Sequence, residues 1–135
     1  MSVTERELIK QLLTESKTIA VVGLSDKPDR ISYIVAANIQ AKGYKIIPVN
    51  PSVSGSILGE TVYAELADIP EPVDIVNVFR KPEHTPAIAQ EAANIGAKAL
   101  WLQLGIVNEE AAQIARDNGL TVIMDRCIKV EASRL

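Results

Sequence analysis

Two residue types that often carry chemistry are almost absent from this sequence, which has one cysteine, Cys127, and one histidine, His84. A lone cysteine excludes an intrachain disulfide and a multi-cysteine metal site, and it agrees with a reducing compartment. A lone histidine removes the commonest zinc ligand sets. We therefore expect no metal in the functional site and a core that folds without disulfide or metal support.

Long apolar runs and an excess of positive charge are also absent. Residues 1–7 lack the apolar stretch of a secretion signal, and no later run approaches the length of a membrane span. The formal net charge is −3, whereas nucleic-acid-binding domains carry a basic footprint. We expect a cytoplasmic protein whose partner is a small-molecule ligand, with no nucleic acid and no membrane as partner. Self-association into a homo-oligomer stays open.

What the sequence does contain is an alternation of short apolar runs with helical patterns. Five runs predict strands, the fourth with its exit included, and they occupy residues 18–22, 45–49, 73–79, 99–105 and 121–124. Strands that alternate with helices imply right-handed crossovers and a covered parallel sheet. We predict an α/β fold in a single domain over residues 1–135, with a doubly wound, mostly parallel five-stranded Rossmann-like sheet and helices on both faces.

Local signals mark the connections between the predicted strands. Thr85 is predicted as the N-cap of one helix, with Pro86 at its first position, and Asn108 as the N-cap of the next helix. Residues 52–69 follow no regular pattern apart from a short helical turn at 64–67. We interpret this segment as a long connection that covers another part of the fold.

The loop after the first predicted strand is rich in polar groups. Ser25, Lys27, Arg30 and Ser32 supply hydroxyl donors, a point charge and a guanidinium fork just before a helix begins. The free backbone N–H groups at that helix start can hold an anion as well. The loop therefore predicts a phosphate-binding turn, with a solvated, charged turn as the alternative.

Polar or flexible residues follow every predicted strand. In open parallel sheets, ligands bind outside the carboxyl ends of the strands, so we expect a small-molecule site where these exits meet. The exits read Gly23-Leu24-Ser25, Asn50-Pro51, Phe79-Arg80, Gln103-Leu104-Gly105 and Asp125-Arg126-Cys127. Their coincidence is a stronger argument for a site than any single loop.

The residues needed for the usual dinucleotide site are lacking. That site has three glycines after the first strand and an acidic residue after the second. Here the loop keeps only Gly23, and the second strand is followed by Asn50. NAD bound in the usual way is therefore disfavoured. A nucleotide with several phosphates fits, because four side chains could converge on them: those of Ser25, Lys27, Arg30 and Arg80.

Several blocks, in order, resemble the small stand-alone CoA-binding proteins, which are related to the CoA-binding half of the succinyl-CoA synthetase α subunit. The resemblance runs from residue 18 to residue 131. The matching blocks are residues 23–30 (GLSDKPDR), 43–44 (GY), 48–51 (PVNP), 74–80 (DIVNVFR), 101–105 (WLQLG) and 124–127 (MDRC). One departure is Ile31, where the family pattern has proline.

By this resemblance the fold is Rossmann-like and the cofactor is coenzyme A or an acyl-CoA. The first loop and the basic side chains would hold the phosphates, and the strand exits would line the path of the pantetheine arm. The residues expected to bind the cofactor are Gly23, Leu24, Ser25, Lys27, Arg30, Ser32, Asn50, Pro51, Phe79, Arg80, Gln103, Gly105 and Cys127.

The resemblance does not carry a reaction with it. The synthetase uses a phosphorylated histidine in a further domain and a partner subunit, and we expect neither here. His84 has no acidic partner that the sequence can place beside it, so we interpret it as a surface or capping residue. We expect binding without catalysis and name no catalytic residue. The alternatives are an NAD(P)-binding oxidoreductase or redox-sensing domain, and a subunit of an acyl-CoA ligase.

Residues near the last predicted strand have structural explanations too. Asp125 and Arg126 are expected to pair with each other or to cap the strand end, and Trp101 is expected in the core. Cys127 is interpreted as a small buried hydrophobic residue. The alternative is a thiol activated by Arg126 and Lys129, which under mild oxidation, for example by exchange with CoA disulfide, forms a reversible mixed disulfide with CoA.

Overall fold

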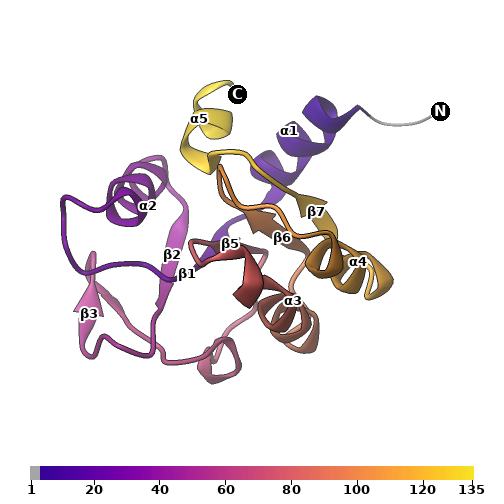
Figure 1. Cartoon of the computed structure of the whole chain (residues 1–135). Helices are drawn as coiled ribbons and strands as arrows, with labels where there is room; N and C mark the ends of the chain where they lie inside the picture. Colours follow the sequence, from indigo (N-terminus) through magenta and orange to yellow (C-terminus); the bar gives the residue numbers. More distant parts are fainter. Residues whose placement is uncertain (1–3) are drawn as a thin grey trace.

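The computed structural model describes residues 4–135 and contains a five-stranded sheet in which all neighbouring strands are parallel (Figure 1). The strands lie in the order β2-β1-β5-β6-β7. Their bounds are β1 Thr18–Val22, β2 Lys45–Val49, β5 Ile75–Val78, β6 Ala99–Leu102 and β7 Thr121–Ile123. The predicted α/β class and Rossmann-like sheet are confirmed, with the last three strands shorter than predicted.

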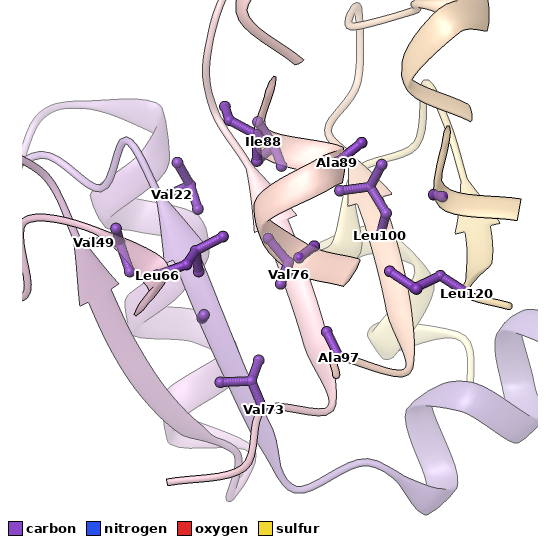
Figure 2. Packing of buried hydrophobic residues seen from close by; sticks show 14 of the residues in the cluster. Val22, Val49, Leu66, Val73, Val76, Ile88, Ala89, Ala97, Leu100 and Leu120 are labelled. Carbon is purple, nitrogen blue, oxygen red and sulfur yellow. The ribbon is translucent and has the colours of Figure 1, made fainter. Parts of the chain in front are cut away.

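Helices cover both faces of the sheet, and each face has its own core (Figure 1). The helices are α1 Glu5–Glu15, α2 Ile31–Ala41, α3 Thr85–Asn94, α4 Glu109–Asp117 and α5 Ile128–Ser133. On one face, Ile88 and Ala89 of α3 pack with Val76 of β5 and Leu100 of β6 (Figure 2). On the other face, α1, α2 and α5 pack around Trp101, which is fully buried as predicted. Within residues 4–135, no helix has the length and apolar character to cross a membrane.

The strands are apolar throughout because both faces of the sheet are covered. Ile19 and Val21 of β1 contribute to the core under α2, whereas Ala20 and Val22 contribute to the core under α3. Successive side chains of a strand point to opposite faces, so a strand buried on both sides needs an apolar residue at each position. This burial explains why runs of apolar residues predicted the strands.

Four short elements, in the connection after β2 and at the end of the chain, were not predicted as they occur. The connection between β2 and β5 contains a small antiparallel hairpin, β3 Ser56–Ile57 and β4 Glu60–Thr61. It is followed by the 3₁₀ helix η1 at Leu66–Asp68, two residues later than the predicted turn. The helix α5, at the end of the chain, was missed. Each of these elements is six residues or fewer, and such segments carry little local signal because packing, rather than propensity, stabilises them.

The prediction that Thr85 is a helix N-cap is wrong. A 3₁₀ helix, η2 Pro82–His84, runs directly into α3, so Thr85 is the first residue of α3 and has helical backbone angles. Its buried hydroxyl donates to the carbonyl oxygen of Pro82 at 2.7 Å. His84 occupies the N-cap position, makes no side-chain capping bond and is exposed, in agreement with its interpretation as a surface residue.

The strand order reverses direction between β1 and β5, and this reversal creates the place for a site. The chain moves from β1 to β2 on one side and then crosses to β5 on the other side of β1. The loops that leave β1 and β5 therefore diverge, one toward α2 and the other toward α3. Such a switch point at the carboxyl ends of the strands is where ligands bind in open α/β sheets.

At the amino ends of the strands, opposite this switch point, Asp74 holds the beginning of β1 beside the beginning of β5. Its carboxylate accepts hydrogen bonds from the backbone N–H of Lys17 at 2.8 Å and of Thr18 at 3.1 Å, and it pairs with Lys98. Desolvation is the largest influence on its pKa and acts to raise it, but the two backbone donors and the Lys98 ammonium together outweigh it and lower the pKa below its usual range. The ionised form is therefore favoured in the folded protein.

Replacing Asp74 by asparagine is expected to lower the free energy of unfolding at pH 7 by about 1 kcal/mol, because the backbone donors lose a charged acceptor. A group whose folded pKa is depressed stabilises the protein above its unfolded pKa, and this stabilisation is lost as the pH falls through the folded pKa. Urea unfolding at several pH values should thus show the difference between wild type and Asp74→Asn shrinking in acid. Glu71→Gln, which removes the exposed ion pair with Lys45, is the control and should change stability little. A difference that stays constant down to low pH would contradict this assignment.

Candidate ligand-binding groove

Two adjoining hollows open at the carboxyl ends of the strands, and we call them together the strand-end groove. They share Ile31 and Phe79 and hold about 730 and 680 Å³ of empty space, open solvent at the mouth included. The polar half is lined by Gly23, Ser25, Asp29, Arg30, Ile31, Ser32 and Phe79. The apolar half is lined by Ile31, Phe79, Arg80, Gln103, Leu104, Ile106 and Cys127.

The loop of the polar half is organised by its own hydrogen bonds. The backbone N–H of Ser25 donates to the hydroxyl oxygen of Ser32 at 3.0 Å, and that of Lys27 donates to the hydroxyl oxygen of Ser25 at 3.1 Å. Both hydroxyl oxygens act as acceptors, so each O–H is still available to donate. Arg30 is the N-cap residue of α2 and makes no capping bond with its side chain. The first turn of α2 therefore faces this loop with unsatisfied N–H groups.

Gly23 allows the loops after β1 and β5 to approach closely. Its φ is +87°, and a Cβ at this position would lie 2.4 Å from the carbonyl oxygen of Phe79 and 3.1 Å from Cδ of Arg80. Only glycine combines this backbone conformation with such a close approach. Arg80 lies against Gly23 of the polar half and also lines the apolar half, so its side chain lies where the two halves meet.

Arg30 and Arg80 bring positive charge to the groove that nothing nearby neutralises through an ion pair. Among residues 4–135, neither guanidinium takes part in an ion pair. Arg30 is exposed and Arg80 is half-buried. The carboxylate of Asp29 also lines the polar half, and it reduces the local positive charge.

Gln103 is the most buried polar side chain of the apolar half, with 4% of its surface exposed. Its Oε1 accepts hydrogen bonds from Nδ2 of Asn77 at 3.2 Å and from the backbone N–H of Ile128 at 3.3 Å. Asn77 is fully buried in β5, and its Nδ2 lies within 3.4 Å of the carbonyl oxygen of Trp101. The amide of Gln103 is thus held from behind by β5 and by the start of α5.

The segment that carries Cys127 is held by contacts on both sides of the cysteine. Nε1 of Trp101 donates to the carbonyl oxygen of Arg126 at 2.8 Å, and the Ile128 N–H donates to Gln103 as described above. Cys127 is half-buried rather than buried: it packs against the core under α2 and also lines the apolar half. The mixed disulfide with CoA stays a prediction.

Of the two expectations for Asp125 and Arg126, pairing with each other is wrong, whereas capping of the strand end describes Asp125. The carboxylate of Asp125 accepts from the backbone N–H of Gly105 at 2.7 Å, which ties the exit of β7 to the exit of β6. The guanidinium of Arg126 pairs instead with Glu5 and with Glu131. These contacts fasten α1 and α5 to the segment beside the groove.

The structure brings together eight of the thirteen residues predicted to bind the cofactor, and five lie outside the two hollows. Leu24 is fully buried, and its carbonyl oxygen accepts from Nδ2 of Asn50, whose Oδ1 accepts from the N–H of Ser52. Lys27 and Pro51 are exposed, and neither belongs to the lining of the groove. Gly105 is engaged with Asp125. A role of these five in binding stays a prediction.

Sequence reasoning missed Asp29, Ile31 and Ile106 of the groove lining, and it named Leu104 only as part of a strand exit and not as a binding residue. Ile31 is 71% exposed and Leu104 is 66% exposed. Large aliphatic residues in otherwise polar loops were the available signal, but a single exposed apolar residue is ordinary, and only the fold shows that Ile31 and Leu104 border the same hollow. No grouping of three His, Cys, Asp or Glu side chains suited to a metal ion occurs in residues 4–135.

Comparison with known proteins agrees with this architecture. The chain is 52% identical over 122 residues to the uncharacterized protein YneT of Bacillus subtilis, covering 90% of both chains. It is 28% identical over 130 residues to the α subunit of an ADP-forming acetate–CoA ligase I of Pyrococcus furiosus, covering 84% of this chain but only 28% of the subunit. A hypothetical protein from Pyrococcus horikoshii has the same fold, with a TM-score of 0.93, 36% identity, and coverage of 100% of this chain and 99% of that one.

The family described as "CoA binding domain" matches residues 17–133, which include every strand of the sheet and both halves of the groove. The chain therefore belongs to the CoA-binding domain family.

Proposed function

We propose that this protein binds coenzyme A or an acyl-CoA in the strand-end groove. The observation that carries the proposal is the continuity of the two halves through Ile31 and Phe79. CoA has an anionic nucleotide end joined to a long, uncharged pantetheine arm. A groove with hydroxyls and a free guanidinium at one end and aliphatic side chains at the other matches this division.

The polar half is suited to phosphate groups. The free O–H groups of Ser25 and Ser32, the Arg30 guanidinium and the N-terminal N–H groups of α2 are all donors to anionic oxygen. Arg80, at the junction of the halves, adds a second guanidinium. Several donors are needed here because Asp29 repels an anion, and the proposed phosphate site has them.

Binding without a reaction is the form of this function that the groove favours. The ionisable side chains in its lining are those of Asp29, Arg30, Arg80 and Cys127, and His84 is not among them. The lining therefore contains no histidine that could work with a carboxylate in acid–base chemistry.

The match to a ligase subunit favours a second candidate, in which this fold serves as the CoA-binding part of an acyl-CoA ligase assembled with other chains.

Replacing Arg30 or Arg80 by alanine is expected to weaken CoA binding by about 10- to 100-fold each, because each loses charge-assisted hydrogen bonds to phosphate. Isothermal titration should show this loss, and the affinity of wild type should fall as salt is raised. The apo melting temperatures should stay close to wild type, since neither residue has an ion pair among residues 4–135.

Arg116→Ala is the matched control, because Arg116 is exposed in the last turn of α4 and lies outside the groove lining. This variant should bind CoA like wild type. Stabilisation by NAD without stabilisation by CoA would contradict the proposal and favour the dinucleotide alternative. Unfolding of apo Arg80→Ala would instead assign Arg80 a structural role.

A further inference from the structure

The amide of Gln103 has one defined orientation in the groove wall. Its Oε1 is held by two donors, Nδ2 of Asn77 and the backbone N–H of Ile128. A flipped amide would place its NH₂ group against these two donors and lose both bonds. The Nε2 atom therefore points to the other side, and no partner for it exists among residues 4–135.

This unpartnered amide group reaches the groove. Within residues 4–135, Oδ1 of Asn77 is the buried side-chain polar atom left without a hydrogen bond, so Nε2 of Gln103 retains access to the hollow that its residue lines. Gln103 as a whole is 96% buried, so its amide is held in the wall of the hollow and is not free in solvent. A donor held rigidly in an apolar wall favours a ligand atom that accepts a hydrogen bond at that point.

The free side-chain polar groups of the apolar half are all of one kind. The amide of Gln103, the guanidinium of Arg80 and the thiol of Cys127 are donors, and the rest of the lining is aliphatic or aromatic. An amide of the pantetheine arm brings an N–H that needs an acceptor. A thioester brings a carbonyl oxygen and no donor, so it matches this half more completely.

The exposed aliphatic side chains give the second part of the match. Ile31 and Leu104 border the apolar half and are mostly in contact with water. A short hydrocarbon chain attached to the thioester would cover them and remove apolar surface from water. Free CoA, which ends in a small thiol, would leave more of this surface exposed.

We propose that the apolar half binds the acyl-thioester end of an acyl-CoA, with Nε2 of Gln103 donating to the thioester carbonyl oxygen and a short aliphatic acyl chain lying against Ile31 and Leu104. This inference rests on the proposed function. It adds that the preferred ligand is the acylated form, and it makes Gln103 a specificity-determining residue.

Three ligands test the inference by isothermal titration: CoA, butyryl-CoA, and S-butyl-CoA, a thioether that keeps the alkyl chain but lacks the carbonyl. Wild type should bind butyryl-CoA about tenfold more tightly than CoA and several-fold more tightly than S-butyl-CoA. In Gln103→Glu, one oxygen can still accept from Asn77 and Ile128, but the donor is replaced by a second acceptor. The preference of this variant for butyryl-CoA over S-butyl-CoA should disappear.

Gln11→Glu is the charge-matched control, because Gln11 is exposed on α1 and outside the groove lining, and it should keep the wild-type ratio. Leu104→Ser tests the acyl contact at an exposed position and should reduce the affinity that the alkyl chain adds over CoA, for butyryl-CoA and S-butyl-CoA alike.

Equal affinity of wild type for butyryl-CoA and S-butyl-CoA would overturn the inference. An equal loss for all three ligands in Gln103→Glu would also overturn it, since the contact would then be to the pantetheine arm. CoA binding without any acyl preference defeats this inference alone, whereas absence of binding by all three defeats the proposed function with it.

Discussion

Gly23→Ala is expected to lower the free energy of unfolding by about 2–5 kcal/mol, because alanine adds backbone strain and a clash at the same position. The φ of +87° is unfavourable for a residue with a Cβ, and the new atom would lie 2.4 Å from the carbonyl oxygen of Phe79. That oxygen belongs to the backbone, so it cannot move without separating the exits of β1 and β5. Since small domains have about 5–15 kcal/mol of stability, this loss is a large fraction of the total.

Gly119→Ala separates the two contributions. Gly119 has a φ of +82°, close to that of Gly23, but a Cβ there meets nothing within 4 Å. Urea unfolding should therefore give a loss of only about 1–2 kcal/mol for this variant. Equal losses at the two positions would show that the close approach to Phe79 does not matter. Gly23→Ala that remains folded should also bind CoA weakly, because the loop of the polar half must shift.

Trp101→Ala is expected to cost about 3–5 kcal/mol of stability, as large-to-small substitutions of fully buried aromatic residues do. Trp101 has no exposed surface and lies in the core under α1, α2 and α5. The variant also leaves the carbonyl oxygen of Arg126 without its indole donor. Because Trp101 is the only tryptophan, unfolding should be followed by circular dichroism rather than by fluorescence.

Trp101→Phe serves as the graded control. Phenylalanine keeps most of the buried apolar surface but cannot donate to Arg126, so a smaller loss of about 1–3 kcal/mol is expected. The released backbone lies next to Cys127 in the groove wall. Trp101→Phe should therefore increase the rate at which a thiol reagent modifies Cys127, and an unchanged rate would contradict a role of the indole in holding this segment.

Much of the fold could be predicted because its signals are local. Apolar runs marked all five strands of the sheet, and the capping signal at Asn108 is confirmed by a hydrogen bond from the N–H of Ala111 to its Oδ1. The alternation of strands and helices was enough for the parallel sheet and, through it, for the edge where the groove lies. The polar loop before α2 and the exits of β5 and β6 were identified for the same reason.

The composition of the groove depends on contacts between residues that are distant in the chain. Leu24 and Ser25 are neighbours, yet the first is buried and the second lines the groove. Asp125 and Arg126 are adjacent, but one binds Gly105 and the other pairs with Glu5, 121 residues away.

The same holds for α5 and for the orientation of Gln103. The start of α5 is held by the bond from Ile128 to Gln103, across 25 residues, and Asn77 reaches the same amide across 26. A pattern of residue types specifies which faces are apolar and where a strand ends. The partner that satisfies each polar group is chosen when the strands and helices pack together, since hydrogen bonds and close contacts depend on distances that sequence spacing does not encode.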